Sequence, residues 1–261
     1  MKTQKLYISL TIVITLCLQL SCSISDASET QSEKVTAEAI AAAIAQADGL
    51  FREREDIVKL RDAVAALAKM RNPGQRNFEV EWKFAKYSYF LGQRTTDQKE
   101  SETVFTKGRD AGNIASSLEP NKPDGYLWYG ANLGELCRMS PITVGLKSVD
   151  DVKGAMNKVI EIQPGYQNSS AYDALAQVEM ESRMYDGTAE KAVELLEKAL
   201  QTEKRNGALR LHLAEALLAV KKDKEARVQI DKVLQMDPDP EYLPEHKDTV
   251  AKAKKLLETK F

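Results

Sequence analysis

The feature that most constrains the fold is a repeated order of apolar and small residues that runs from residue 36 to the end of the chain. It is clearest in residues 207–240, where two segments with apolar residues at every third or fourth position are followed by Pro238. The core-facing positions of the two segments are Leu213, Ala214, Leu217, Ala226, Ile230 and Val233. This spacing is that of an amphipathic α-helix, and one helix pair cannot bury both of its apolar faces by itself. Neighbouring pairs must therefore stack on one another.

Four earlier units show the same order in a weaker form, which makes five units in all. They span Thr36–Pro73, Trp82–Pro120, Tyr126–Pro164 and Ala171–Asn206. The spacing of about 34 residues and the small residue in the first helix of a unit resemble the tetratricopeptide repeat. We therefore predict an all-α, tetratricopeptide-like solenoid of helical hairpins over residues 36–261, with about five degenerate repeats.

Departures from the repeat length predict where this solenoid is irregular. The second unit is longer than the consensus, so extra residues must lie between or within its helices. The third unit has a long connection through Pro141 and Gly145, and the fourth has one through Met184–Gly187, with Thr188 as the expected cap of the next helix. Residues His246–Lys260 carry an apolar stripe and predict a C-terminal capping helix.

The segment Gly125–Gly134 concentrates aromatic and small residues in a chain that is otherwise charged and rich in alanine. Gly130 and Leu133 fit the core positions of a first helix, which leaves Trp128 and Asn132 on its other faces. Two interpretations are open. Either the glycines permit close helix contact and the aromatic residues belong to the core, or Trp128 and Asn132 line a binding surface.

The composition excludes several classes of function. With 37 basic and 39 acidic residues the chain has no strong positive field, so we expect no nucleic-acid partner. Its two histidines, His212 and His246, do not stand at metal-ligand spacing, and the sequence has no Gly-rich phosphate loop or nucleophile elbow. We therefore predict no metal, no cofactor and no catalytic residue. An enzyme with Cys137 as nucleophile is the weakest hypothesis, because no histidine is near it in the sequence.

The N-terminus predicts export. A basic segment, residues 1–5, precedes an apolar run over residues 6–20, and a small residue then precedes Cys22. This order resembles a bacterial lipoprotein signal peptide over residues 1–21, with Cys22 as the acylated first residue of the mature chain. Ordinary cleavage after Ala27 is the alternative.

Residues 22–35 are rich in Ser, Thr, Glu and Gln and predict a flexible tether between the lipid and the domain. Ser23 follows the cysteine, where a serine is typical of lipoproteins sorted to the outer membrane. Together these features predict a periplasm-facing lipoprotein that is held at the membrane, on the outer-membrane side, by its N-terminal lipid.

Candidate binding residues follow from the geometry of the repeat. First helices form the concave wall and their core-phase residues are used in packing, so the residues beside these positions are the candidates. They are Lys83, Tyr87, Phe90, Leu127, Trp128, Asn132, Asp173 and Gln177. An apolar pocket edged by a few polar groups suits a small molecule, and the same wall suits a partner helix. The alternative is that Tyr87 and Phe90 only pack one repeat against the next.

Three stretches resemble one family beyond the generic repeat. They are Tyr89-Phe90-Leu91-Gly92, the core Gly125-Tyr126-Leu127-Trp128-Tyr129-Gly130-Ala131-Asn132-Leu133-Gly134, and residues 149–164 with Val152, Val159 and Ile162. With this combination the chain resembles the T component of TRAP-type periplasmic transport systems, the TatT family, over residues 45–240. It departs from the family at Glu135-Leu136-Cys137, where members are more apolar, and at Gln167-Asn168-Ser169-Ser170, where members are glycine-rich.

The resemblance implies a lipoprotein of helical hairpins that associates with a TRAP substrate-binding protein and surrounds a cleft for a small apolar ligand. The leading hypothesis is therefore a lipid-anchored accessory component that holds a periplasmic solute-binding protein, the TRAP P component, and a small hydrophobic ligand. The second hypothesis is a general envelope scaffold that binds peptide segments during outer-membrane assembly. A closed cavity with aromatic walls would favour the small ligand, and a long open polar groove would favour the peptide.

Overall fold

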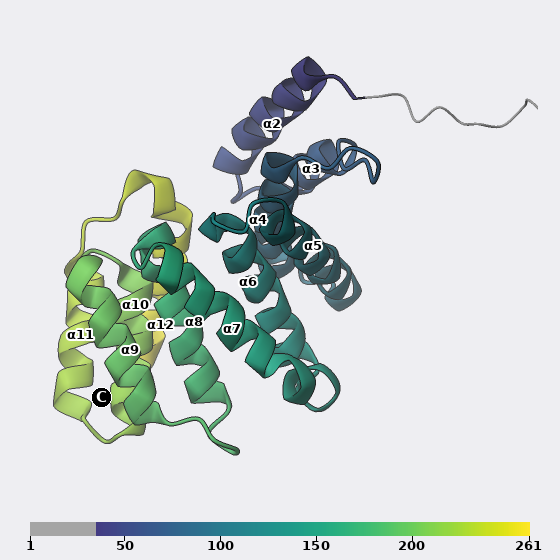
Figure 1. The fold of residues 1–261 in the computed structure, drawn as a ribbon. Coiled ribbons are helices and arrows are strands. Elements are labelled where there is room, and N and C mark those ends of the chain that lie inside the picture. Colours follow the sequence, from purple (N-terminus) through teal and green to yellow (C-terminus); the bar gives the residue numbers. More distant parts are fainter. Residues whose placement is uncertain (1–34) are drawn as a thin grey trace, which may run out of the picture. The chain divides into compact units, whose positions relative to one another are not determined.

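Helices make up nearly all of the described chain. The computed structural model describes residues 35–261, and this range contains eleven α-helices and no β-strand (Figure 1). The helices are α2 (Ala37–Arg52), α3 (Ile57–Ala68), α4 (Phe78–Arg94), α5 (Gln98–Leu118), α6 (Pro123–Met139), α7 (Leu146–Ile162), α8 (Tyr166–Glu181), α9 (Ala189–Thr202), α10 (Gly207–Ala219), α11 (Asp223–Gln235) and α12 (Leu243–Lys260). A π-helical turn, η1 (Pro141–Gly145), precedes α7, and a 3-10 turn, η2 (Pro240–Tyr242), precedes α12. The predicted all-α class is confirmed.

The helices form five consecutive hairpins, α2–α3, α4–α5, α6–α7, α8–α9 and α10–α11, and α12 packs on the last of them. Each hairpin contacts the next along the chain (Figure 1). The predicted solenoid of five tetratricopeptide-like repeats with a C-terminal capping helix is therefore confirmed. By their mutual contacts, residues 35–261 form one unit.

Polar side chains fix many of the helix starts. The caps of α2, α3, α4, α5, α9 and α10, which accept hydrogen bonds from first-turn N–H groups, are Thr36, Asp56, Asn77, Asp97, Thr188 and Asn206. Thr188 is the cap expected from the sequence, and its Oγ1 lies 3.1 Å from the Lys191 nitrogen. Each such cap stabilises a helix by about 1 kcal/mol. Pro123 begins α6, where the missing N–H has no partner to lose.

The extra length of units two and three lies in helices. Helices α4 and α5 have 17 and 21 residues, and only residues 95–97 separate them. In unit three, the loop expected through Pro141 and Gly145 is wrong, because these residues form η1 and continue directly into α7. The N–H groups of Val144 and Gly145 both donate to the Ser140 carbonyl, which keeps this segment helical. The long connection of unit four is present between α8 and α9.

Two main hydrophobic clusters fill the interior. The one in α8–α12 is built from aliphatic residues and Tyr172, with Leu196, Ala214 and Ile230 almost completely buried. The other joins α2–α8 and contains large aromatic side chains such as Phe84 and Trp128. The two parts of the solenoid therefore differ in the size of the side chains that fill them.

Helices α5 and α6 approach so closely that only glycine fits between them. A Cβ added to Gly112 would lie 2.4 Å from the Tyr129 nitrogen, and one added to Gly125 would lie 2.3 Å from a backbone nitrogen of α5. Gly130 faces α7, where an added Cβ would lie 2.5 Å from the methyl group of Met156. The first interpretation of the Gly125–Gly134 segment, close helix contact at Gly130 and Gly134, thus applies to Gly130 but not to Gly134, where an added Cβ would meet only Val152 at 4.0 Å.

Charged side chains join the first hairpin to the capping helix in what we call the end clasp. Nε and Nη2 of Arg54 donate to the two carboxylate oxygens of Glu245 at 2.8 and 2.6 Å, and Nη2 also donates to the Glu241 carbonyl at 2.5 Å. Lys247 binds Glu55 at 2.8 Å beside this pair. Arg54 is 5% exposed and thus shielded from water, whereas the Lys247–Glu55 pair is exposed. Residues separated by 191 positions in the chain thus hold the two ends of the hairpin stack together.

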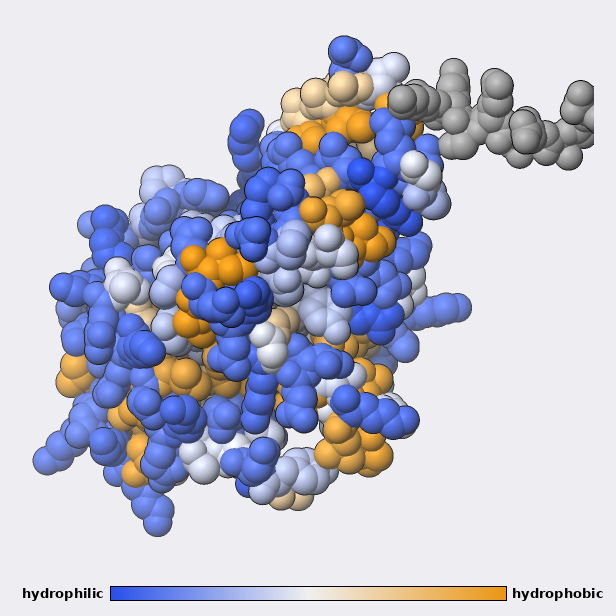
Figure 2. All heavy atoms as spheres, in the orientation of Figure 1, coloured by the Kyte–Doolittle hydropathy of each residue, from blue (hydrophilic) through white to orange (hydrophobic). Residues whose placement is uncertain are grey.

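The outer surface is mostly hydrophilic. Figure 2 shows hydrophilic side chains over most of one face, with several hydrophobic groups among them, one of them over α2. There Ala37, Ile40, Ala41 and Ile44 line a groove of about 460 Å³. None of the described helices has the length and apolar character needed to cross a bilayer. The predicted signal peptide, the acylated Cys22 and all but the last residue of the tether lie outside the described residues.

Candidate functional site

A cavity of about 1180 Å³ lies along the first helices of the hairpins. Its walls come from α4, α6 and α8, from η1 and α7, from the start of α10, and from η2 and α12. Apolar lining residues are Leu127, Ala131, Leu146, Val149, Val152, Met156 and Val178. Glu245 belongs both to this wall and to the end clasp, so the clasp borders the cavity.

The charged lining of the cavity is predominantly acidic. The carboxylates are Glu135, Asp150, Asp173, Glu181, Asp186, Asp239 and Glu245, and the guanidinium groups are Arg138, Arg183 and Arg205. Arg183 and Arg205 are exposed and donate to backbone carbonyl oxygens. Of the three arginines, only Arg138 forms ion pairs with carboxylates of the lining.

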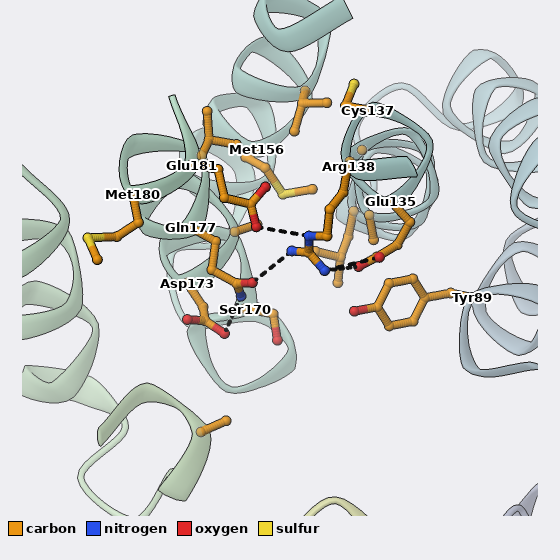
Figure 3. A pocket seen from close by; sticks show the side chains of 18 of the residues that line it. Tyr89, Glu135, Cys137, Arg138, Met156, Ser170, Asp173, Gln177, Met180 and Glu181 are labelled. Carbon is orange, nitrogen blue, oxygen red and sulfur yellow. Dashed lines mark hydrogen bonds and ion pairs between the residues drawn. The ribbon is translucent and has the colours of Figure 1, made fainter. Parts of the chain in front are cut away.

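Arg138 is the centre of a polar network between α6 and α8 (Figure 3). Its Nε donates to Glu181 at 2.8 Å, its Nη1 to both oxygens of Glu135 at 3.0 and 3.1 Å, and its Nη2 to Gln177 at 3.1 Å. One guanidinium group therefore forms ion pairs with two carboxylates. Burial raises the pKa of Glu135, and the positive charge of Arg138 opposes this shift without cancelling it.

Tyr89, Phe90 and Trp128, which we call the aromatic cluster, lie at one end of the lining. Their ring centroids are 5.6 Å (Tyr89 to Phe90), 5.8 Å (Tyr89 to Trp128) and 6.0 Å (Phe90 to Trp128) apart. Figure 3 shows the hydroxyl group of Tyr89 directed toward the Glu135–Arg138 pair. Trp128 is 6% exposed, and its Nε1–H has no acceptor among the described residues. The cluster therefore places aromatic faces beside the polar network.

Asp173 extends the polar side of the cavity toward α10. The Gln177 side chain donates to Oδ2 of Asp173 at 3.4 Å. Oδ1 of Asp173 lies 2.7 Å from Nδ1 of His212. Burial acts to lower the pKa of His212, but the charge and hydrogen bond of Asp173 outweigh burial and raise it. The pair links the first helices of the fourth and fifth hairpins.

The start of α8 contains three consecutive residues with left-handed backbone. Gln167, Asn168 and Ser169 have φ values of 47°, 56° and 62°, a conformation that costs about 1–2 kcal/mol for each non-glycine residue. The side chain of Asn206 donates to the Asn168 carbonyl at 3.1 Å, and the Ser169 hydroxyl lies 3.1 Å from that of Thr202. This is the stretch in which the TRAP T components are glycine-rich, and Gln167 and Asn168 line the cavity.

Five of the eight predicted groove residues line the cavity: Phe90, Leu127, Trp128, Asp173 and Gln177. They come from α4, α6 and α8, the first helices of three successive hairpins. The structure thus brings these five together, and their role in binding stays a prediction.

Lys83 and Tyr87 lie elsewhere, between the first two hairpins. Lys83 Nζ binds the two carboxylate oxygens of Asp48 at 2.8 and 2.6 Å, and the Tyr87 hydroxyl donates to the same carboxylate. The Tyr87 ring stacks on Phe51 with centroids 4.2 Å apart. The prediction that Lys83 and Tyr87 line the groove is wrong, because α2 covers this side of α4. For Tyr87 the structure agrees with the alternative, that it packs one repeat against the next.

Asn132 is also absent from the cavity wall, because it is fully buried between helices. Its Nδ2 donates to the Ala85 carbonyl at 3.0 Å and to the Trp128 carbonyl at 2.6 Å. Gly108 of α5 leaves room for it, since an added Cβ there would lie 2.3 Å from the Asn132 oxygen. Asn132 ties α6 to α4 and is corrected from a groove residue to a structural one.

Four residues that form the polar part of the cavity were not predicted from the sequence: Tyr89, Glu135, Arg138 and Glu181. Glu135 and Arg138 are three residues apart, a spacing that predicts an ion pair on one helix face. That local signal could have found them, but nothing local indicates that Glu181 completes the network from another hairpin. The end clasp has no local signal at all.

The structure holds few features of a catalytic or metal centre. Cys137 lines the cavity and is partly buried, and burial raises the pKa of its thiol, which disfavours the nucleophilic thiolate. Among residues 35–261, no group of three or more His, Cys, Asp or Glu side chains is placed to hold a metal ion.

Solved structures share this fold at low sequence identity. TTC0263, a thermophilic TPR protein in Thermus thermophilus, matches with a TM-score of 0.61 and 16% identity, over 83% of this chain and 98% of that chain. The crystal structure of MamA matches with a TM-score of 0.48 and 16% identity, over 77% of this chain and 95% of that chain. At such identity the likeness to TTC0263 shows the tetratricopeptide fold alone.

Family models match both parts of the chain. No curated protein matches it by sequence. Residues 183–243 match the model described as tetratricopeptide repeat, and residues 43–175 match the model described as regulator of microtubule dynamics protein 1-3. The second match covers just over half of the chain. The chain therefore belongs to the regulator of microtubule dynamics protein 1-3 family, and its C-terminal part is a tetratricopeptide repeat.

Proposed function

We propose that this protein is a non-catalytic binding component of the cell envelope that holds a small, largely apolar molecule in its cavity. The observation that carries the proposal is the cavity itself, with a volume of about 1180 Å³, apolar walls and one central polar network. Small-molecule sites typically have about 300–1000 Å³ and combine apolar walls with a few placed polar groups. The cavity is somewhat larger than this range and has the composition of such a site.

The end clasp favours a small ligand over an extended peptide. A peptide that lies along a solenoid needs a groove that is open at its ends, whereas Arg54 and Glu245 join the first hairpin to the capping helix beside the cavity. Aromatic side chains also form part of the wall. A scaffold that binds peptide segments during envelope assembly is therefore the second candidate, supported by the tetratricopeptide fold.

The proposed biological role is that of an accessory T component of a TRAP-type transport system. In this role the protein binds a periplasmic solute-binding protein and is anchored by an acylated Cys22 at the outer membrane. The support is the resemblance of residues 125–134 to the T components and the predicted signal peptide. The family is named for regulation of microtubule dynamics, and the predicted export signal argues against a cytoskeletal role for this chain.

The test is native mass spectrometry of the full-length protein, extracted from membranes of its source organism in mild detergent. Wild type is expected to carry the added mass of a small molecule, and Gly134→Leu is expected to lose it. Gly134 lines the cavity, and an added Cβ there would meet only Val152, at 4.0 Å, so leucine fills free space. Gly154→Leu on α7 is the matched control, because nothing lies within 4 Å of an added Cβ. A wild type without bound molecule would contradict the proposal.

The same preparation tests the partner. A periplasmic solute-binding protein present in fixed ratio supports the TRAP role, and proteins of outer-membrane assembly support the scaffold role. If the partner co-purifies with Gly154→Leu but not with Gly134→Leu, binding of the partner depends on the cavity.

A further inference from the structure

The polar network of the cavity has more negative than positive charge. Arg138 binds both Glu135 and Glu181, and it is the one cation that the structure places in ion-pair contact with Glu135 among the described residues. The Glu135 side chain is 12% exposed, so water screens its charge only weakly. The raised pKa of Glu135 agrees with a buried carboxylate that is not fully compensated. A positive group on a ligand would complete this balance.

The aromatic cluster beside the network is suited to a positive group. An ammonium or guanidinium group within about 6 Å of a ring centroid is attracted by the negative face of the ring. The protein already uses this attraction, since Lys86 Nζ lies 5.7 Å from the Trp128 ring and the Arg54 guanidinium carbon 5.8 Å from the Phe90 ring. Neither Lys86 nor Arg54 lines the cavity. Tyr89 lines the cavity, and its hydroxyl group lies near the Glu135–Arg138 pair (Figure 3).

The rest of the lining also favours a positively charged group over a negatively charged one. Carboxylates outnumber guanidinium groups by seven to three along the wall, and Arg183 and Arg205 are exposed at its edge. Two of these carboxylates have partners behind the wall, since Asp173 pairs with His212 and Glu245 with Arg54 and Arg94. Beyond the network the wall is apolar at Ala131, Leu146 and Val149. Such a site repels an anionic head group and accepts an apolar chain.

From these observations we propose that the cavity binds an organic cation. An ammonium head lies between Tyr89 and the Glu135 carboxylate, and an apolar body extends along α6 and α7. This inference rests on the proposed small-ligand function and assigns the chemical class of that ligand.

The test is isothermal titration calorimetry of the full-length protein with three probes that share one chain and differ in the head group. They are hexyltrimethylammonium, hexan-1-ol and hexanoate. Hexyltrimethylammonium should bind roughly tenfold more tightly than hexan-1-ol, as expected for one desolvated cation–aromatic and carboxylate contact, and hexanoate should bind most weakly. Glu135→Gln should remove the advantage of the cation while leaving hexan-1-ol binding unchanged. Glu190→Gln, on the exposed side of α9, is the matched control and should change neither affinity.

Different failures have different meanings. If wild type binds hexan-1-ol or hexanoate as tightly as the cation, or if Glu135→Gln keeps the preference, the cation assignment is overturned and the small-ligand function stands. If none of the probes binds, the assignment is overturned, and an empty cavity in the native mass spectrum would overturn the small-ligand function with it. The comparison of probes on wild type decides the question even if Glu135→Gln folds poorly.

Discussion

The α4–α7 region and the α8–α11 region build the same hairpin architecture with different contacts. Helices α9, α10 and α11 have 13 or 14 residues and pack through alanine and leucine at the consensus positions. Helices α4–α7 have 17 or 21 residues and pack through aromatic side chains and through glycines that bring backbones together. The C-terminal region matches the general tetratricopeptide model, and the region before it matches the more specialised family.

This difference shows what a repeat pattern can and cannot specify. Consensus positions fix which face of a helix is buried, and Ala226, Ile230 and Val233 are buried as that pattern requires. In the α4–α7 region the consensus positions are buried in the same way, but residues at other positions set the distance between the helices. Gly112 and Asn132 are the main examples, and neither belongs to the repeat consensus.

The largest expected effect comes from breaking the glycine contact. Gly112→Leu should lower the free energy of unfolding by about 3 kcal/mol, because the added side chain meets the backbone of α6, which cannot move aside. Gly154→Ala is the matched control on an exposed part of α7 and should raise it by about 1 kcal/mol, the helix-propensity difference. Urea unfolding measures both. Equal effects of the two substitutions would show that the close contact of α5 and α6 is not required.

A second substitution separates the two ends of the hairpin stack, which enclose both regions. Arg54→Ala should lower the free energy of unfolding by about 2 kcal/mol, since it leaves the Glu241 carbonyl without its donor and the Glu245 carboxylate with only the 3.5 Å contact to Arg94. The radius of gyration from small-angle X-ray scattering should also increase as the ends move apart. The exchanged pair Arg54→Glu with Glu245→Arg should recover part of the stability. If Arg54→Ala leaves both quantities unchanged, the end clasp does not hold the ends together.

The smallest expected effect concerns pH and the α8–α10 contact. Asp173 raises the pKa of His212 above its ordinary value of 6.5, so the pair stabilises the fold fully below that pH and loses this contribution as pH rises through the higher folded-state pKa. The free energy of unfolding of wild type relative to His212→Gln should therefore fall, by less than about 1 kcal/mol, between pH 6 and about pH 8.5. Urea unfolding at the two pH values measures it. His246→Gln serves as the control, and a pH-independent difference for His212→Gln would contradict the prediction.

The sequence predicted more of the fold than of the site. The five hairpins, the capping helix and the Thr188 cap follow from local spacing, and the structure agrees with them. Only the local connection at η1 differs, because residues 141–145 continue a helix in spite of Pro141 and Gly145. Among the groove candidates, first-helix positions identify Phe90, Leu127 and Asp173 as lining residues, but the same rule also selects Lys83 and Tyr87, which α2 covers.

By itself, the sequence of this protein determined the helices, their pairing and the order in which they stack, since these depend on residues three or four positions apart and on neighbouring segments. Only the tertiary structure decided which polar residues face the cavity and where the stack closes. Glu181 reaches Arg138 from another hairpin, and Glu245 reaches Arg54 from the far end of the chain. Such contacts depend on the curvature that all the hairpins produce together, and no local pattern encodes that curvature.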